Sequence, residues 1–165
     1  MKEIIIEKLY KIVKVPYEFL FKNTSPWEVS ITDFINLPEE SLGFHLGCFL
    51  LKYNLEPQPK LEEHDIYHVL TDTGVLVTDE INMQFYLLGN GKKSPFVFMV
   101  IATGLLFYPF RIKTYIESYK KGKKAHQFYH LDFLKMLPIP LKTIKSTFNI
   151  NYANYFSIVS DEQKA

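Results

Sequence analysis

The chain has 165 residues, which is enough for one well-packed domain and too few for two ordinary ones. Hydrophobic residues make up 47% of it and the formal net charge is only +1, so the composition excludes a disordered chain and a strongly basic nucleic-acid binder. A single arginine, Arg111, and the lack of a recognisable nucleic-acid-binding motif also argue against a nucleic acid partner. The single cysteine, Cys48, excludes an intramolecular disulfide, and its apolar neighbours predict a buried thiol.

The first predicted elements are helical. Charged and apolar residues alternate over positions 1–8, with no long apolar core and no small-residue cleavage site, so we expect no signal peptide. Apolar residues then recur at helical spacing from Ile6 to Val13 and predict an opening amphipathic helix that Pro16 interrupts. Ser25 followed by Pro26 predicts the N-cap and first turn of another helix.

Further helix boundaries follow along the chain. Ser41 precedes a predicted helix over about 42–53, and residues 61–70 form the next. After a turn over 71–74, a helix is expected near Thr78, whose hydroxyl can cap it. The sequence Gly89-Asn90-Gly91 should end that helix, because these residues best tolerate positive φ. No segment alternates strand and helix convincingly, so we predict one all-α domain of about seven helices over residues 1–165.

Residues 96–110 form the most apolar stretch. They fall short of the ~18–20 apolar residues that span a bilayer, and Thr103, Gly104 and Pro109 interrupt them. The simplest expectation is a buried central helix kinked near Pro109. A second expectation, compatible with the first, is that this helix lines a channel for a hydrophobic tail, with Ala102 and Gly104 leaving room beside it. The lining residues would be Phe96, Met99, Val100, Gly104 and Phe107.

Charge is unevenly distributed along the chain. Residues 28–80 carry eleven acids against two lysines, a net −9, whereas residues 111–145 carry nine bases against two acids, a net +7. The run Lys120-Lys121-Gly122-Lys123-Lys124 could meet anionic headgroups, at about 1 kcal/mol per Lys near a membrane surface. Peripheral membrane contact is therefore one expectation, and a solvated loop is the other.

The segment 64–80 carries a candidate metal site. His64 and His68 are one helical turn apart, so both imidazoles project from one face, and Asp65 flanks that face. Glu80 follows a turn that can return a carboxylate towards them. Two imidazoles with one or two carboxylates suit Zn²⁺ and are acceptable to Mn²⁺, Fe²⁺ or Co²⁺. The alternative is two unrelated surface histidines.

Other histidine patterns fit less well. The His-Glu-x-x-His zinc motif needs a glutamate where this chain has Asp65. A His-Asp phosphohydrolase needs a further upstream His and a distant Asp, and no spacing recommends His45 and Asp132 for those roles. His126 and His130 form a second pair at helical spacing, but no acid stands where Glu80 stands for the first pair, so we expect a structural role.

The pattern His64-Asp65-x-x-His68, eleven residues, then Glu80 resembles the signature of the coenzyme Q (ubiquinone) biosynthesis protein 4 family. The sequence Leu37-Pro38-Glu39-Glu40-Ser41-Leu42-Gly43 is similar to the family's entry into a helix. The segment Gly122-Lys123-Lys124-Ala125 and the closing run 141–150 look like its C-terminal helices. The resemblance covers about residues 20–150 and implies an all-α fold.

The resemblance implies a function in quinone synthesis. It implies that such proteins remove the ring carboxylate of a polyprenylated hydroxybenzoate. It also implies a divalent metal, foremost Zn²⁺, on His64, Asp65, His68 and Glu80. Asp65 could instead orient a ligating histidine. The alternative is a lipid-holding scaffold that presents quinone precursors to other biosynthetic enzymes around a structural metal. A closed four-ligand site favours the scaffold, and an open position beside an apolar channel favours the enzyme.

The resemblance also predicts a location. Eukaryotic members of the family carry mitochondrial leaders, and this chain shows no Arg-rich transit peptide. We therefore expect a bacterial cytoplasmic protein. The membrane contact that the lysine run and the charge asymmetry predict would then be at the inner face of the membrane.

Overall fold

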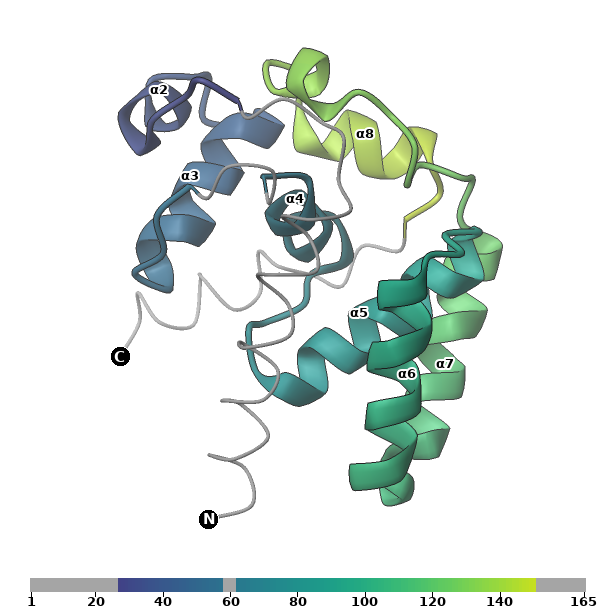
Figure 1. The fold of residues 1–165 in the computed structure, drawn as a ribbon. Coiled ribbons are helices and arrows are strands. Elements are labelled where there is room, and N and C mark those ends of the chain that lie inside the picture. The colour runs from purple at the N-terminus through teal and green to yellow at the C-terminus, as the bar shows by residue number, and fades with distance from the viewer. Residues whose placement is uncertain (1–26, 58–61, 151–165) are drawn as a thin grey trace, which may run out of the picture.

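The computed structural model describes residues 27–57 and 62–150. Within these ranges the regular structure is α-helical with two short 3-10 helices, and no β-strand is present. The all-α prediction is therefore confirmed, and the described residues contain the expected seven α-helices (Figure 1). The predicted opening helix around residues 6–13 lies outside the described residues. In chain order the elements are α2 (Ile31–Ile35), α3 (Leu42–Lys52), α4 (Glu62–Thr71), α5 (Val77–Asn90), α6 (Pro95–Phe107), η1 (Pro109–Arg111), α7 (Ile112–Lys124), η2 (Phe133–Met136) and α8 (Leu141–Thr147).

Local sequence signals set several helix ends correctly. Ser41 is the N-cap of α3, and its hydroxyl accepts the backbone N–H of Phe44 at 3.2 Å. Ser94 caps α6 in the same way, ahead of a proline at the first helical position. Gly91 ends α5 with φ +108°, the left-handed conformation that glycine adopts without strain. The predicted boundaries at Ser41 and Gly91 are confirmed.

One predicted helix start and one predicted cap are wrong, whereas the predicted start of α5 near Thr78 is confirmed, because that helix begins at Val77. Ser25 and Pro26 lie outside the described residues, but residues 27–30 are not helical, and α2 begins only after Ser30. Ser30 and Asp33 form a reciprocal capping box, which stabilises the later start. At α5 the N-cap is Leu76 rather than Thr78, and the Asp79 carboxylate accepts the Leu76 N–H at 3.3 Å.

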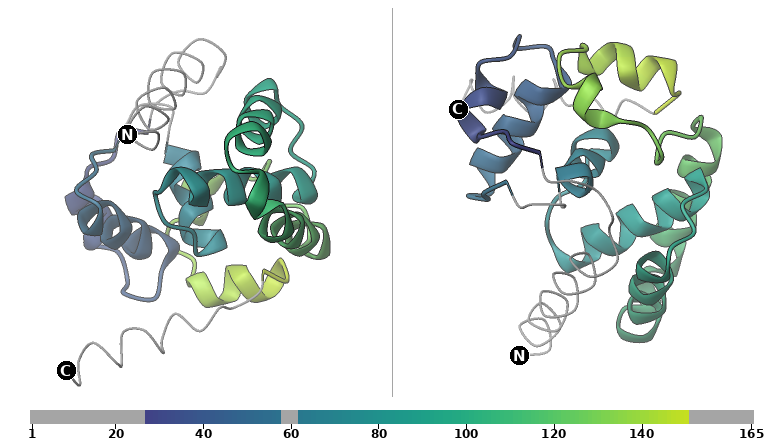
Figure 2. Two further views of the ribbon diagram at one scale, coloured as in Figure 1. Left: turned by 90° about the horizontal axis from the view of Figure 1, so that it is seen from below. Right: turned by 45° about the horizontal axis from the view of Figure 1, so that its top comes forward.

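Helix α4 lies at the centre of one half of the molecule, between α3, α5 and α8 (Figures 1 and 2). Its buried apolar side chains join those of α3, α5 and the C-terminal segment in a cluster that we call the first core. The first core also includes aromatic rings from residues that follow α7, so the C-terminal part of the chain closes over α4. Its largest fully buried apolar members are Tyr67, Phe34, Phe128, Phe133, Leu42, Leu46, Leu50, Ile66 and Leu70.

A separate cluster, the second core, lies between α5, α6 and α7 and consists of Ile81, Phe85, Phe96, Val100, Tyr108 and Tyr115. Helices α6 and α7 therefore pack on the side of α5 that faces away from α4 (Figure 2). The rings of Phe85 and Tyr115 stack with centroids 4.9 Å apart. Helix α5 is thus shared by the two cores.

Helices α5 and α7 approach each other closely because each has a glycine at the contact. A Cβ on Gly89 would collide with the carbonyl of Tyr119, and one on Gly122 with the carbonyl of Tyr86. The buried Asn90 side chain then joins the two helix ends: its Nδ2 donates to the His126 carbonyl at 3.0 Å, and its Oδ1 accepts the Phe128 N–H at 3.0 Å.

The most apolar helix, α6, is not the buried central helix that its composition predicts. It packs on α5 through one face, while Phe98, Leu106 and Phe107 on other faces are exposed. The break near Pro109 is confirmed, because α6 ends at Phe107 and the chain turns by 107° into the next helix. Among the described residues no single helix is long and apolar enough to cross a bilayer, and only α6 with the segment 109–124, a bent pair, passes that test.

Candidate metal centre

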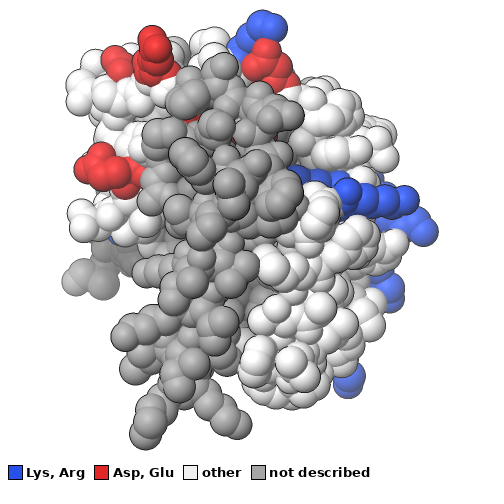
Figure 3. All heavy atoms as spheres, viewed as in Figure 1, with Lys and Arg blue, Asp and Glu red and all other residues white. Residues whose placement is uncertain are grey.

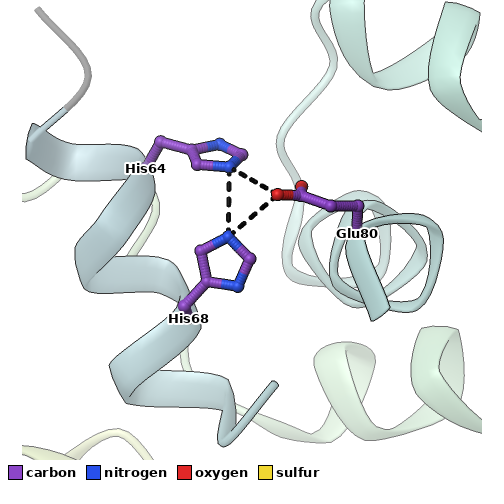
Figure 4. A group of neighbouring side chains, drawn as sticks. All are labelled: His64, His68 and Glu80. Carbon is purple, nitrogen blue, oxygen red and sulfur yellow. Dashed lines mark hydrogen bonds and ion pairs between the residues drawn. The ribbon is translucent and has the colours of Figure 1, made fainter. Parts of the chain in front are cut away.

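The candidate site lies where α4 faces the first turn of α5. His64 and His68 stand one turn apart on α4, and the turn over residues 71–76 returns the chain so that Glu80 points at both rings (Figure 4). Glu80 lies in the first turn of its helix, where the helix dipole favours a carboxylate. All three side chains are buried, with 3%, 2% and 4% of their residue surface exposed.

Three donor atoms converge in a nearly equilateral triangle. Nε2 of His64 lies 3.2 Å from Nε2 of His68, and Oε1 of Glu80 lies 3.2 Å from the first and 3.1 Å from the second. Among the described residues this is the group of histidine, cysteine and acidic side chains that could hold a metal ion.

Protons alone cannot satisfy this triangle. The ionised Glu80 oxygen only accepts hydrogen bonds, and each Nε2 either donates or accepts. If both Nε2 atoms carry protons, both donate to Glu80 and then face each other as two donors. If one carries a proton, it satisfies a single edge. One cation in contact with all three atoms satisfies every edge at once.

The spacing and the donor types fit a small, borderline-soft cation. At metal–ligand distances of about 2.0–2.1 Å, neighbouring donors stand about 3.3–3.4 Å apart in a tetrahedral site and about 2.8–3.0 Å apart in an octahedral one. The observed 3.1–3.2 Å lies between these values. Two imidazoles argue against Ca²⁺ and Mg²⁺, which prefer oxygen ligands. The residues present therefore fit Zn²⁺.

A chain of hydroxyl groups fixes the His68 ring in the ligating tautomer. The Thr71 hydroxyl donates to the Tyr67 carbonyl at 2.7 Å, so its oxygen is left to accept from the Thr73 hydroxyl, 3.0 Å away. Thr73 Oγ1 is then left to accept from Nδ1–H of His68 at 3.3 Å. With the proton on Nδ1, Nε2 presents its lone pair to the triangle.

This relay was not predicted from the sequence, although the Thr-Asp-Thr-Gly run at the end of α4 is a polar turn that could have suggested hydroxyl partners. Stacking also holds one face of the same ring. Phe49 of α3 stacks on His68 with centroids 5.3 Å apart and planes at 18°.

A buried ion pair also contacts the turn that follows α4. Lys145 of α8 lies 2.5 Å from Asp72, and only 2% of the Lys145 side chain is exposed. Burial raises the pKa of Asp72 and lowers the pKa of Lys145, and each partner's charge acts against the effect of burial. Burial also lowers the pKa of the nearby His45, with the Lys145 charge adding to the effect. Burial raises the pKa of Tyr86 to about 12, with a further contribution from the Asp72 charge.

The structure brings together three of the four predicted ligands. Asp65 lies between the two histidines on α4, half-buried, and is not part of the triangle. Its role as a fourth ligand or as an orienting partner stays a prediction.

The five predicted channel residues all lie on α6, the helix that packs on α5 in the second core. Phe96, Val100 and Gly104 are buried in or against the second core, Met99 is partly buried beside it, and Phe107 is exposed. The expected room beside Gly104 is absent, because Ile81 of α5 occupies it.

The remaining predicted features are surface residues. His126 and His130 are exposed and lie after α7 rather than on a helix, so they do not form a helical pair. The lysines of the 120–124 run are exposed at the end of α7 and are helical rather than a loop. Cys48 is exposed, contrary to prediction, although burial of part of the residue raises its pKa.

Comparison with known proteins shows a related fold. No protein-family model and no curated protein sequence matches the chain. A crystal structure from Nostoc punctiforme, of a protein described as a "putative ubiquinone biosynthesis protein", matches with a TM-score of 0.63 and 19% sequence identity. The match covers 89% of this chain and 80% of that one. At this identity the likeness establishes a common fold.

Proposed function

We propose that this protein acts in ubiquinone biosynthesis, and that it uses a divalent metal, foremost Zn²⁺, to remove the carboxylate from a polyprenylated hydroxybenzoate head group. The buried triangle of two imidazoles and a carboxylate supports the metal. The resemblance of the His64–Glu80 pattern to the coenzyme Q biosynthesis protein 4 family and the fold of the Nostoc protein support the pathway.

The number of protein ligands is the observation that carries the enzyme hypothesis. Catalytic zinc sites use three protein ligands, such as two histidines and a glutamate, and leave a position for substrate, whereas structural sites are closed by four. The described residues supply three: His64, His68 and Glu80. A site with these three protein ligands would favour an enzyme, and coordination by Asp65 as a fourth ligand would favour a scaffold with a structural metal.

The reaction needs few protein groups. The bond between the ring and its carboxylate breaks, CO₂ leaves, the bonding electron pair stays on the ring carbon, and a proton from solvent replaces the lost group. A bound divalent ion would supply a Lewis acid for the oxygens of the head group. His64, His68 and Glu80 would hold the ion, and Thr73 would keep the His68 ring in its ligating tautomer.

Gln84 is suited to orienting the head group. It lies one helical turn after Glu80 on α5, it is buried, and its Oε1 has no hydrogen-bond partner among the described residues. A buried acceptor without a partner costs about 1–3 kcal/mol, and a phenolic hydroxyl of a bound head group would supply the missing donor.

Metal analysis tests the site. Wild-type protein incubated with Zn²⁺ and then desalted should retain close to one ion per chain, and His68→Ala should lose it. His130→Ala is the matched control, because it removes an exposed histidine that is not in the triangle, and it should retain the ion. Equal metal content in wild type and His68→Ala would rule out the assignment.

Product analysis separates the enzyme from the scaffold. Zinc-loaded protein is incubated with a short-chain prenylated hydroxybenzoate labelled at its carboxylate, and released CO₂ is counted. The enzyme hypothesis expects release by wild type and none by Glu80→Gln, which retains the side-chain volume without the charge. Binding of the lipid and the metal without any CO₂ release would instead support the scaffold.

A further inference from the structure

The half of the molecule away from the metal centre has an exposed apolar surface. Of the twelve large exposed hydrophobic side chains in the described residues, eight lie between positions 98 and 119, so they form a concentration rather than isolated exposures. We call their central part, around the turn from α6 into α7, the elbow surface. It comprises Leu105, Leu106, Phe107, Phe110, Ile112 and Ile116.

Both helices expose an apolar stripe in addition to the face that they bury. Helix α6 contains no charged residue, so its solvent side is as apolar as the side that packs on α5. On α7, Ile112, Ile116 and Tyr119 recur at i, i+4 and i+7 and are exposed, whereas the buried Tyr115 and Gly122 face α5. A helix on an ordinary water-exposed surface would carry polar residues at these positions.

The charges around the elbow surface are positive. Between residues 95 and 124 there are six basic residues and one acid, Glu117, and the two bases nearest the turn, Arg111 and Lys113, are both exposed. In Figure 3 the acidic side chains lie on the upper part of the visible face, while the lower right is uncharged and bordered by basic groups. An apolar surface bordered by cations complements the anionic surface of a membrane.

The geometry suits shallow insertion rather than crossing. Helix α6 and the segment 109–124 differ in direction by 107°, and neither alone can span a bilayer. The most exposed apolar side chains, Leu106 at 72% and Phe110 at 76%, lie on either side of this turn. Apolar and aromatic side chains beside lysine and arginine are the composition with which peripheral segments bind at the interface between headgroups and acyl chains.

We propose that the elbow surface docks the protein on an anionic lipid bilayer, with Leu106 and Phe110 inserted at the interface and Arg111 and Lys113 against the phosphate groups. This proposal stands on the surface alone and holds whether or not the metal centre is catalytic. It relocates the membrane contact predicted from the 120–124 lysine run to the turn between α6 and α7.

Vesicle flotation of the full chain tests the docking. Wild type should float with vesicles of phosphatidylcholine and phosphatidylglycerol in equal parts and should float less with phosphatidylcholine alone or as salt rises. Leu106→Ser/Phe110→Ser should weaken the partition coefficient about tenfold or more, because both side chains enter the apolar region. Arg111→Gln/Lys113→Gln should weaken it about fivefold for each lost charge. The matched control is Leu51→Ser/Leu134→Ser, which removes two exposed leucines outside the elbow surface and should bind like wild type.

Three outcomes would overturn the proposal. One is that the Leu106→Ser/Phe110→Ser variant floats with the vesicles as well as wild type does. Another is that wild type sediments as a dimer and does not float, while the same variant sediments as a monomer. That result would make the surface an interface between copies of the chain. The third is a fall in the melting temperature of this variant well beyond that of the control, which would mean that the two side chains pack within the folded protein rather than enter a bilayer.

Discussion

The two halves of this protein, one around each core, differ in which side chains are buried and which are exposed. Around α4, ionisable side chains are inside: Glu62, His64, His68, Glu80 and Lys145 are all buried. Between residues 95 and 124, by contrast, no ionisable acid, histidine, lysine or arginine is buried, and large hydrophobic side chains are outside. Helix α5 connects the two halves, with Glu80 facing α4 and the neighbouring Ile81 in the second core.

This contrast separates two tasks. Burying charge is costly unless hydrogen bonds or ion pairs compensate, so a protein retains it where a site needs a preorganised interior. Exposing large apolar side chains is a liability for a free surface and indicates a surface that meets a partner. The half around α4 has the features of a site, and the half around α6 and α7 has the features of a contact surface.

The largest expected effect comes from breaking the ion pair of the first half. Asp72→Asn removes the carboxylate charge that is paired with the buried Lys145 and should lower the free energy of unfolding by about 3 kcal/mol. Asparagine preserves the side-chain shape and tolerates the left-handed backbone at this position, where φ is +52°, so the change isolates the charge. Urea denaturation with an unchanged m-value measures the loss.

Two further variants sharpen this prediction. Asp72→Asn/Lys145→Met should recover most of the loss, because the remaining buried charge is removed. Asp132→Asn removes one partner of the exposed Asp132–Lys135 pair and should cause no measurable change. A loss in Asp72→Asn no larger than in Asp132→Asn would show that the buried pair contributes little.

How much the sequence predicts depends on how local the cause is. The triangle follows from i, i+4 spacing on α4 and a carboxylate in the first turn of α5, and the caps at Ser41 and Gly91 follow from single residue types. Composition alone shows that α6 is apolar but not which face of α5 it meets, so the expected channel beside Gly104 is instead filled by Ile81. The Lys145–Asp72 pair joins residues 73 positions apart, and no local pattern indicates it.

A smaller loss of stability is expected from the packing of the second half, where the cause is steric rather than electrostatic. Gly122→Ala should lower the free energy of unfolding by about 2 kcal/mol, because the added Cβ collides with the Tyr86 carbonyl and forces α7 away from α5. Helix propensity alone would predict a gain of about 1 kcal/mol for this change, so the sign of the result is diagnostic. Zinc content should not change. Lys123→Ala, an exposed change on the same helix, is the control. A stabilised Gly122→Ala protein would show that the two helices are not in such close contact.

The smallest predicted effect concerns the tautomer of His68. Thr73→Val retains the shape of the side chain but removes the oxygen that is left to accept from His68 Nδ1–H, so the ring is no longer held with its Nε2 lone pair towards the triangle. Loss of such an outer partner typically weakens metal binding 10–100-fold, and we expect about tenfold, or about 1.4 kcal/mol, because Phe49 still holds the ring by stacking. Competition with a zinc-binding dye measures the affinity, and Thr73→Ser, which restores the hydroxyl, should bind zinc like wild type. A role in folding alone would lower the melting temperature of Thr73→Val without changing its zinc affinity, and that result would remove Thr73 from the metal centre.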